Sequence, residues 1–294
     1  MNIKKIKEMN ENYFHGRGEE QRKTKRLKPI ILGVLVLVVL QAMLGTISYQ
    51  MLFNRQALQI ILAGILITMI VSFSLRTLVE TVQRIYHSFQ EPVDYEKTIY
   101  RIYELAIEVK KNGALSIEKE IQQEKDEFMR DAVTLLCDYK RPEAMETLLD
   151  RDIASRKMHM GKSKNVMRMM AQVSPALGLI GTLVGLIGLL GNLEEMNMIM
   201  THMAAALVST LYGSLIANFV AVPFIARLQE YSDHQILRYT MVKEGILLIA
   251  REDTARNVFY TMNVMLKEED RLIYPRHQQI VNEKGGEGLV YDQI

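Results

Sequence analysis

The side chains of this sequence that could do chemistry are hydroxyls and amides placed inside long apolar runs. Thr182 stands at the centre of the uncharged, glycine-rich stretch SPALGLIGTLVGLIGLLG, residues 174–191. A second apolar run, 203–228, carries Ser209, Thr210, Tyr212, Ser214 and Asn218. Neutral oxygens of this kind can face a conduction path, as ligands or through water, or they can bond carbonyls of their own or a neighbouring helix. The residues alone leave both uses open for Thr182 and Thr210.

Two prolines accompany these hydroxyls. Pro175 precedes Thr182 by seven residues, which is about two helical turns, so both are expected on one helix face. Pro223 lies near the end of the second run. A proline removes a backbone donor and frees a carbonyl one turn earlier, which can leave an exposed oxygen in a channel or only a tolerated kink.

The apolar runs lack ionisable groups. None contains Asp, Glu, Lys, Arg or His well inside it, although ion-moving membrane proteins usually place such a group at membrane depth. If this protein conducts ions, the carboxylate must therefore come from a partner.

Four segments are apolar and long enough to cross a bilayer, which takes about 20 helical residues. They are 30–52, 57–75, roughly 169–193 and 203–227. Strand signals occur only inside these segments, so we predict an all-α integral membrane protein with four transmembrane helices and a helical cytoplasmic domain. In the fourth segment, a stripe of small residues predicts close helix packing: Ala206, Thr210, Gly213 and Ala217.

Charge distribution predicts the topology. Basic residues stand immediately before the first span, which has no leader-type cleavage site after it and is read as retained. Both termini are therefore expected in the cytoplasm, with residues 53–56 and 191–202 outside. The resulting division is a basic N-terminal extension (1–29), spans one and two (30–75), a cytoplasmic helical domain (76–168), spans three and four on the ion-path side (169–228), and cytoplasmic C-terminal helices with a tail (229–294).

The aqueous parts show no active-site pattern. The histidines lack metal-ligand spacing, and no phosphate loop, dinucleotide fingerprint or nucleophile elbow is present. We expect no catalytic residue, metal, cofactor or nucleic-acid partner, and the lone Cys137 is interpreted as a buried core thiol. Helices are expected over 95–110, 114–123, 126–138, 142–158, 227–250 and 254–266, with Gly113 interrupting the first two.

The last two apolar runs together resemble the A subunit of the bacterial flagellar stator, the MotA/PomA family within the MotA/TolQ/ExbB proton channel superfamily. The resemblance extends over residues 57–272 and includes three aqueous segments: VKKNGALSIEKEI, METLLDRDI and KEGILLIARED. The family implies an inner-membrane motor in which five A subunits surround a dimer of a MotB-like B subunit. An aspartate in the B-subunit helix binds H⁺ or Na⁺, and ion passage turns the ring.

The resemblance also implies roles for individual positions. Pro175 and Pro223 match the family's two functional prolines, and Thr182 and Thr210 match hydroxyls that face the B-subunit aspartate. Threonines at both positions are typical of sodium-driven stators, but proton-driven relatives outside the flagellum carry them too. The coupling ion, H⁺ or Na⁺, therefore stays open.

Lys110 and Glu118 match the family's charged pair that engages the rotor protein FliG. By themselves they would be an ordinary solvated helix surface. The family commonly has arginine where Lys110 stands, and lysine keeps the charge but loses the planar fork for bidentate contact. The basic extension is a second departure, because family members often begin almost directly with the first span.

Two other functions remain as alternatives. A TolQ/ExbB-like or phage-defence motor subunit would share the last two helices, but TolQ and ExbB relatives typically have one span before the cytoplasmic domain, where two are predicted here. A passive membrane scaffold would also fit helices without buried charge.

Overall fold

The computed structural model describes residues 53–89, 93–138, 141–191 and 196–275, together with the isolated helical positions Val38 and Gln41. The predicted basic extension, the rest of the predicted first span and the C-terminal tail after residue 275 lie outside the described residues. Every regular element within the described ranges is a helix, as predicted. In order they are α3 (Arg55–Ser72), α4 (Leu75–Ser88), α5 (Tyr95–Asn112), η1 (Ala114–Ile117), α6 (Glu118–Ile121), α7 (Glu127–Cys137), α8 (Pro142–Leu190), α9 (Met196–Leu215), η2 (Ile216–Ala221), α10 (Val222–Ala250), α11 (Ala255–Asn263) and η3 (Glu268–Asp270).

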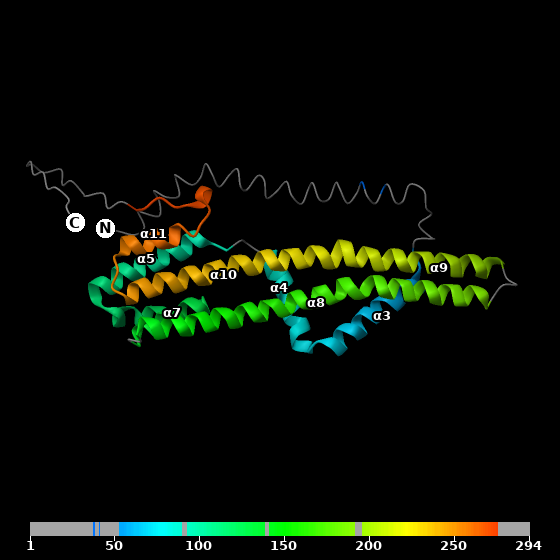
Figure 1. The fold of residues 1–294 in the computed structure, drawn as a ribbon, viewed down its shortest axis with the longest axis horizontal. Coiled ribbons are helices and arrows are strands. Elements are labelled where there is room, and N and C mark those ends of the chain that lie inside the picture. Colours follow the sequence, from blue (N-terminus) through cyan, green and yellow to red (C-terminus); the bar gives the residue numbers. More distant parts are fainter. Residues whose placement is uncertain are drawn as a thin grey trace, which may run out of the picture.

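Two very long helical rods dominate the molecule (Figure 1). One is α8, whose 49 residues correspond to about 74 Å at 1.5 Å per residue. The other is the continuous run of α9, η2 and α10, which packs along α8. Both exceed the ~30 Å hydrocarbon core of a bilayer, so each rod must continue from the membrane into water. Among the described residues, α3, α8 and the 198–250 run are long and apolar enough to span a membrane.

The rods join elements that the sequence separates. Residues 142–158 and 169–193 were expected as different helices, as were the fourth span and 227–250, but no break occurs between them. The polar stretch between the first two contains Gly161, which costs a helix about 1 kcal/mol relative to alanine. Nothing lies within 4 Å of where its Cβ would be, so no close contact requires a glycine here. Packing elsewhere along the two rods keeps the helix continuous through this stretch.

The second predicted span is shorter than expected. Asn54 caps α3 by accepting from the Ala57 N–H at 2.9 Å, and α3 ends at Ser72 instead of continuing to residue 75. Ser74 caps a separate amphipathic helix, α4. The buried face of α3 packs against the inner part of both rods through Ile61, Ile65, Met69, Val166, Met167 and Leu228.

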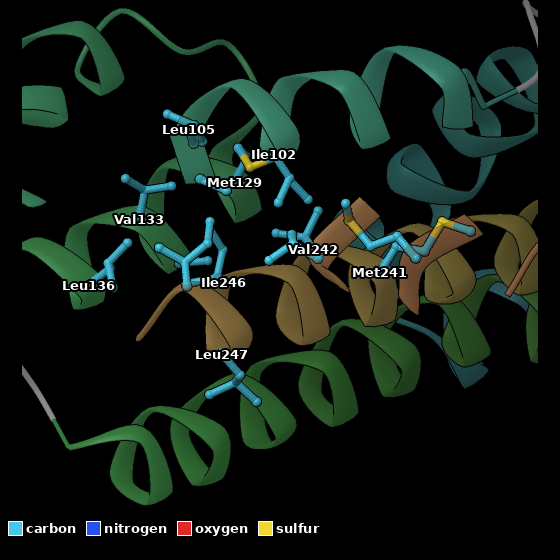
Figure 2. Close-up of a cluster of buried hydrophobic side chains, with 14 of the residues drawn as sticks. Ile102, Leu105, Met129, Val133, Leu136, Met241, Val242, Ile246 and Leu247 are labelled. Carbon is cyan, nitrogen blue, oxygen red and sulfur yellow. The ribbon is translucent and has the colours of Figure 1, made fainter. Parts of the chain in front are cut away.

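A helical bundle of α5, α7 and α11 surrounds the start of α8 and the end of α10, at one end of the molecule (Figure 1). Figure 2 shows its core, where side chains of α5, α7 and α10 meet, among them Ile102, Met129 and Ile246. Cys137 is buried in this core, as predicted, and its thiol donates to the Ala114 carbonyl at 3.3 Å. The predicted aqueous helices therefore assemble into a single cored unit.

Polar contacts join the rods within and beside this bundle. Lys164 Nζ lies 2.6 Å from Gln229 Oε1, and Lys243 Nζ lies 3.0 Å from Asp150 Oδ1. The Arg156 guanidinium on α8 lies over the Tyr239 ring on α10, 5.5 Å from its centroid. These contacts recur along the rods and hold the two helices in register.

Candidate ion-path site

The site begins at a seam of small residues where α8 and α9 touch. A Cβ on Gly213 would lie 2.5 Å from the Ser174 carbonyl, and one on Gly185 would lie 2.7 Å from Ala206 Cβ. Real Cβ atoms do not approach so closely, so these positions require glycine. The predicted small-residue stripe on α9 does face α8, and the close approach of the backbones supplies the packing that holds helices together in lipid.

Thr182 and Thr210 meet across this seam. Their Oγ1 atoms are 2.5 Å apart, and Thr182 Oγ1 also lies 3.0 Å from the Ala206 carbonyl and 3.1 Å from that of Gly178. Each hydroxyl has one hydrogen to donate, so a chain forms when Thr210 donates to Thr182 and Thr182 donates to a carbonyl. Thr210 is exposed in the single chain and Thr182 is half-buried. The pair therefore presents oxygen at the open edge of the seam.

Pro175 lies inside α8, on the same rod as Thr182, and is exposed. Because proline has no N–H, the Ala171 carbonyl loses its helical donor. The preceding Ser174 hydroxyl donates to the Met170 carbonyl at 2.6 Å. The helix continues through this position, and the Ala171 carbonyl is left without its helical hydrogen bond.

Pro223 is placed differently, just after the π-helical segment η2. The Val222 N–H donates to the Ala217 carbonyl, five residues back. Asn218 lies in this segment, exposed, with its Nδ2 3.0 Å from the Ser214 carbonyl. Sequence reasoning noted Asn218 and Ser214 as polar but missed the π turn. The spacing of Asn218 and Pro223, five residues apart, was the signal that could have indicated it.

Lys110 and Glu118 lie in the helical bundle, far along the rods from the threonine pair. Lys110 is in the last turn of α5 and Glu118 opens α6. Between them the chain turns at Gly113, whose φ of 83° suits glycine. Both side chains are exposed, and within the described part of the chain no salt bridge joins them to each other.

Each of these two charges affects a neighbour. The pKa of Asp253 is lowered mainly by a hydrogen bond from Asn257 and one from the Thr254 N–H, with a smaller contribution from the Lys110 charge. Burial raises the pKa of the Cys137 thiol, and the nearby Glu118 carboxylate adds to this. Because Lys110 and Glu118 are exposed and not paired with each other, they present two separate charges on the bundle surface.

Metal chemistry has no support in the described ranges, where no cluster of His, Cys, Asp and Glu side chains could hold a metal ion. The arrangement consists of two neutral hydroxyls at the edge of a tightly packed helix seam. The neutral oxygens of Ser214 and Asn218 follow further along the second rod. Such a site can bind a cation weakly or pass water, and it needs a charged group from elsewhere to bind an ion strongly.

Comparison with known sequences shows which proteins this chain is similar to. Residues 120–241 match the MotA/TolQ/ExbB proton channel family. The matched segment is less than half of the chain, and over it the chain is similar to members of that family. Relatives include uncharacterized protein YtxD of Bacillus subtilis, which is 28% identical over 257 residues, 87% of this chain and 94% of YtxD. Motility protein A of Borreliella burgdorferi is 30% identical over 170 residues (58% and 65%), and chemotaxis protein PomA of Vibrio alginolyticus is 27% identical over 244 residues (83% and 95%).

Solved structures share the fold of this chain. A chain of the Campylobacter jejuni MotAB structure matches with a TM-score of 0.73 and 19% identity, covering 82% of this chain and 96% of that one. A chain of the flagellar MotAB stator complex from Bacillus subtilis matches with a TM-score of 0.72 and 21% identity (83% and 96%). The all-helical fold class is thereby confirmed. The motility-protein relatives and the apolar helices together indicate a multi-pass inner-membrane protein.

Proposed function

We propose that this protein is the A subunit of an ion-driven flagellar motor stator, which couples H⁺ or Na⁺ flow through the inner membrane to torque on the rotor. Its family is a channel family, and several relatives are named as motility proteins. The observation that carries the proposal is the Thr182–Thr210 contact at the open edge of a glycine seam. Two hydroxyls at the edge of a seam can line a path, whereas packing alone would be served by the glycines.

The path needs a partner. The membrane parts of the described helices supply hydroxyls, amides and carbonyls, with no carboxylate among them. A MotB-like B subunit supplies the aspartate that carries H⁺ or Na⁺ past the threonine pair, with Pro175 and Pro223 shaping the two helices. Both matched structures are of MotAB, which supports this pairing.

The assembly is a ring of five copies around a B-subunit dimer. Apolar side chains of α8 such as Leu179, Leu183 and Ile187 are more than half exposed in the single chain, so neighbouring subunits or lipid must cover them. Both termini lie in the cytoplasm, together with the helical bundle. The exposed Lys110 and Glu118 contact the rotor protein FliG there, because surface charges orient a partner more than they stabilise a fold.

The test is the swimming speed of cells that depend on this subunit and its native partner. Sodium is removed at fixed pH, and separately a protonophore is added while sodium is kept. Loss of swimming in one arm identifies the coupling ion and supports the flagellar role. Cells that assemble the complex in the membrane but never swim under either condition would point to a TolQ/ExbB-like motor or a passive scaffold.

A matched pair of variants tests the hydroxyls themselves. Thr210→Val keeps the shape of the side chain and removes the oxygen, so we expect swimming to fall at least about tenfold, since hydrogen bonds to charged groups are worth about 1.5–3 kcal/mol. Thr68→Val is the control, because the Thr68 hydroxyl only donates to Gly64 O at 2.8 Å within its own helix. Equal loss in both variants would contradict a special role for the pair.

A further inference from the structure

The backbone carbonyl of Asn218 has no helical hydrogen-bond donor. In an α-helix the donor would be the Val222 N–H, but that group donates to the Ala217 carbonyl instead. In a π turn the donor would be residue 223, which is a proline and has no N–H. Among the described residues no side chain donates to this oxygen either. An oxygen left in this state at membrane depth is tolerated only where protein or a water-filled cavity supplies a partner.

The position of this oxygen along the rod fits a path. Asn218 precedes Arg227 by nine residues, about 13 Å along the helix. Arg227 is the first charged residue after this apolar run, at the end that the proposed topology places in the cytoplasm; its guanidinium pairs with Glu230 at 2.8 Å and donates to the Ser88 carbonyl. Thr210 lies eight residues on the other side, about 12 Å further out. Asn218 is therefore between the threonine pair and the cytoplasm.

Two side-chain oxygens, those of Asn218 and Ser214, accompany the Asn218 backbone carbonyl. The Asn218 Nδ2 donates to the Ser214 carbonyl, which leaves Oδ1 as the free end of the amide. Neither Oδ1 nor the Ser214 hydroxyl has a hydrogen-bond partner within the described ranges. Asn218 is exposed, whereas Ile216 of the same segment packs toward α3. The Asn218 oxygens thus lie on a part of the rod that the described residues leave exposed, with the half-buried Ser214 hydroxyl one turn away.

We propose that the Asn218 turn is a second cation-binding step on the inner half of the ion path, holding H₃O⁺ or Na⁺ by neutral oxygens after it leaves the partner's carboxylate. The inference rests on the proposed function and deepens it. Neutral oxygens suit such a step, because an ion must bind well enough to enter and weakly enough to leave. Released backbone carbonyls in broken membrane helices serve as ligands for transported cations in the same way.

The experiment uses the complete protein with its native B subunit in proteoliposomes under an imposed membrane potential. Ion flux is measured against Na⁺ concentration at fixed pH and against pH at fixed Na⁺, so whichever series saturates identifies the cation. Asn218→Ala is expected to raise the half-saturating concentration of that cation about tenfold, as loss of one oxygen ligand to a charge implies. Val220→Ala, an exposed neighbour in the same turn without a side-chain oxygen, should leave it unchanged.

Several results would overturn the proposal. An unchanged half-saturating concentration in Asn218→Ala, with or without a lower maximal flux, would mean that a neighbouring helix satisfies the turn and that Asn218 serves packing. If Asn218→Ala fails to assemble, Asn218→Ser keeps an oxygen and must show a smaller shift in the same direction; no shift refutes the site. A wild-type complex that passes neither ion refutes the proposed function itself, and the inference with it.

Discussion

At the scale of single residues, the membrane seam depends on side chains that are absent. Glycine contributes nothing to packing by itself, but its missing Cβ lets α9 approach α8 until backbone atoms nearly touch. The threonine contact lies on this seam, because a Cβ on Gly178, one turn before Thr182, would come within 3.1 Å of Thr210 Cα. The seam and the candidate ion path are therefore one feature.

Two glycine-to-alanine variants test this dependence. Gly213→Ala places a methyl group 2.5 Å from the Ser174 carbonyl, so we expect a loss of about 1–3 kcal/mol in the free energy of unfolding. Gly161→Ala has nothing within 4 Å of its new methyl group and should gain about 0.5–1 kcal/mol, since alanine suits a helix interior better. The measurement is thermal unfolding of the detergent-solubilised protein. A Gly213→Ala protein as stable as wild type would show that the helices are not packed this closely.

At the scale of elements, the segment after α11 is held by one buried amide. Asn263 Nδ2 donates to the Leu272 carbonyl at 2.8 Å, and its Oδ1 accepts from the Leu272 N–H at 2.7 Å. Leu272 is buried in the bundle core, and Tyr274 packs against Phe259 with ring centroids 5.3 Å apart. The Asn263 side chain thus supplies the two backbone hydrogen bonds of Leu272 that a neighbouring strand or helix would otherwise provide.

Replacing this amide should release the segment selectively. Asn263→Ala leaves the Leu272 N–H and carbonyl without partners, at a cost of about 1–3 kcal/mol. We expect faster hydrogen exchange over residues 267–275, with protection of α5 and α10 retained. Asn257→Ala is the control, because Asn257 is exposed and bonds only Asp253 and the Thr254 cap. Equal protection in wild type and Asn263→Ala would mean that core packing alone holds the segment.

At the scale of the whole molecule, the candidate ion site and the charged bundle surface lie far apart, and the two rods connect the parts of the molecule that carry them. Thr182 is 40 residues from the start of α8, about 60 Å at 1.5 Å per residue. The rods between them are continuous and are joined by cross-helix contacts such as Lys243–Asp150. A change at the seam can reach the bundle as movement of a stiff body, because no loop interrupts the rods.

This separation predicts that torque and ion flow can be uncoupled. Lys110→Glu reverses a surface charge far from the seam, so swimming should fall severely while ion flux in proteoliposomes stays within about twofold of wild type, as expected when a distant exposed charge is changed. Lys267→Glu, an equal reversal at another exposed position, should affect neither. Normal swimming in Lys110→Glu cells would remove Lys110 from the rotor contact.

The sequence by itself determined the helical class, the apolar spans now seen as α3, α8 and α9, the small-residue stripe and the buried Cys137. These follow from composition and periodicity, which are local properties of a chain. The residues of the last two apolar runs also carried the resemblance to the MotA/PomA family. The roles of Thr182, Thr210, Pro175 and Pro223 stay predictions.

The tertiary structure alone decided three things. It joined separate predicted helices into two rods, because packing along α8 and α10 outweighs weak helix formers such as Gly161. It brought Thr182 and Thr210 into contact, which spacing within each helix cannot specify. It also produced the π turn at Asn218, since the number of residues between a carbonyl and its donor depends on how the helix is held at both ends. The first two depend on contacts between residues distant in the chain, which local sequence patterns do not record. For the π turn, the sequence offered only the spacing of Asn218 and Pro223.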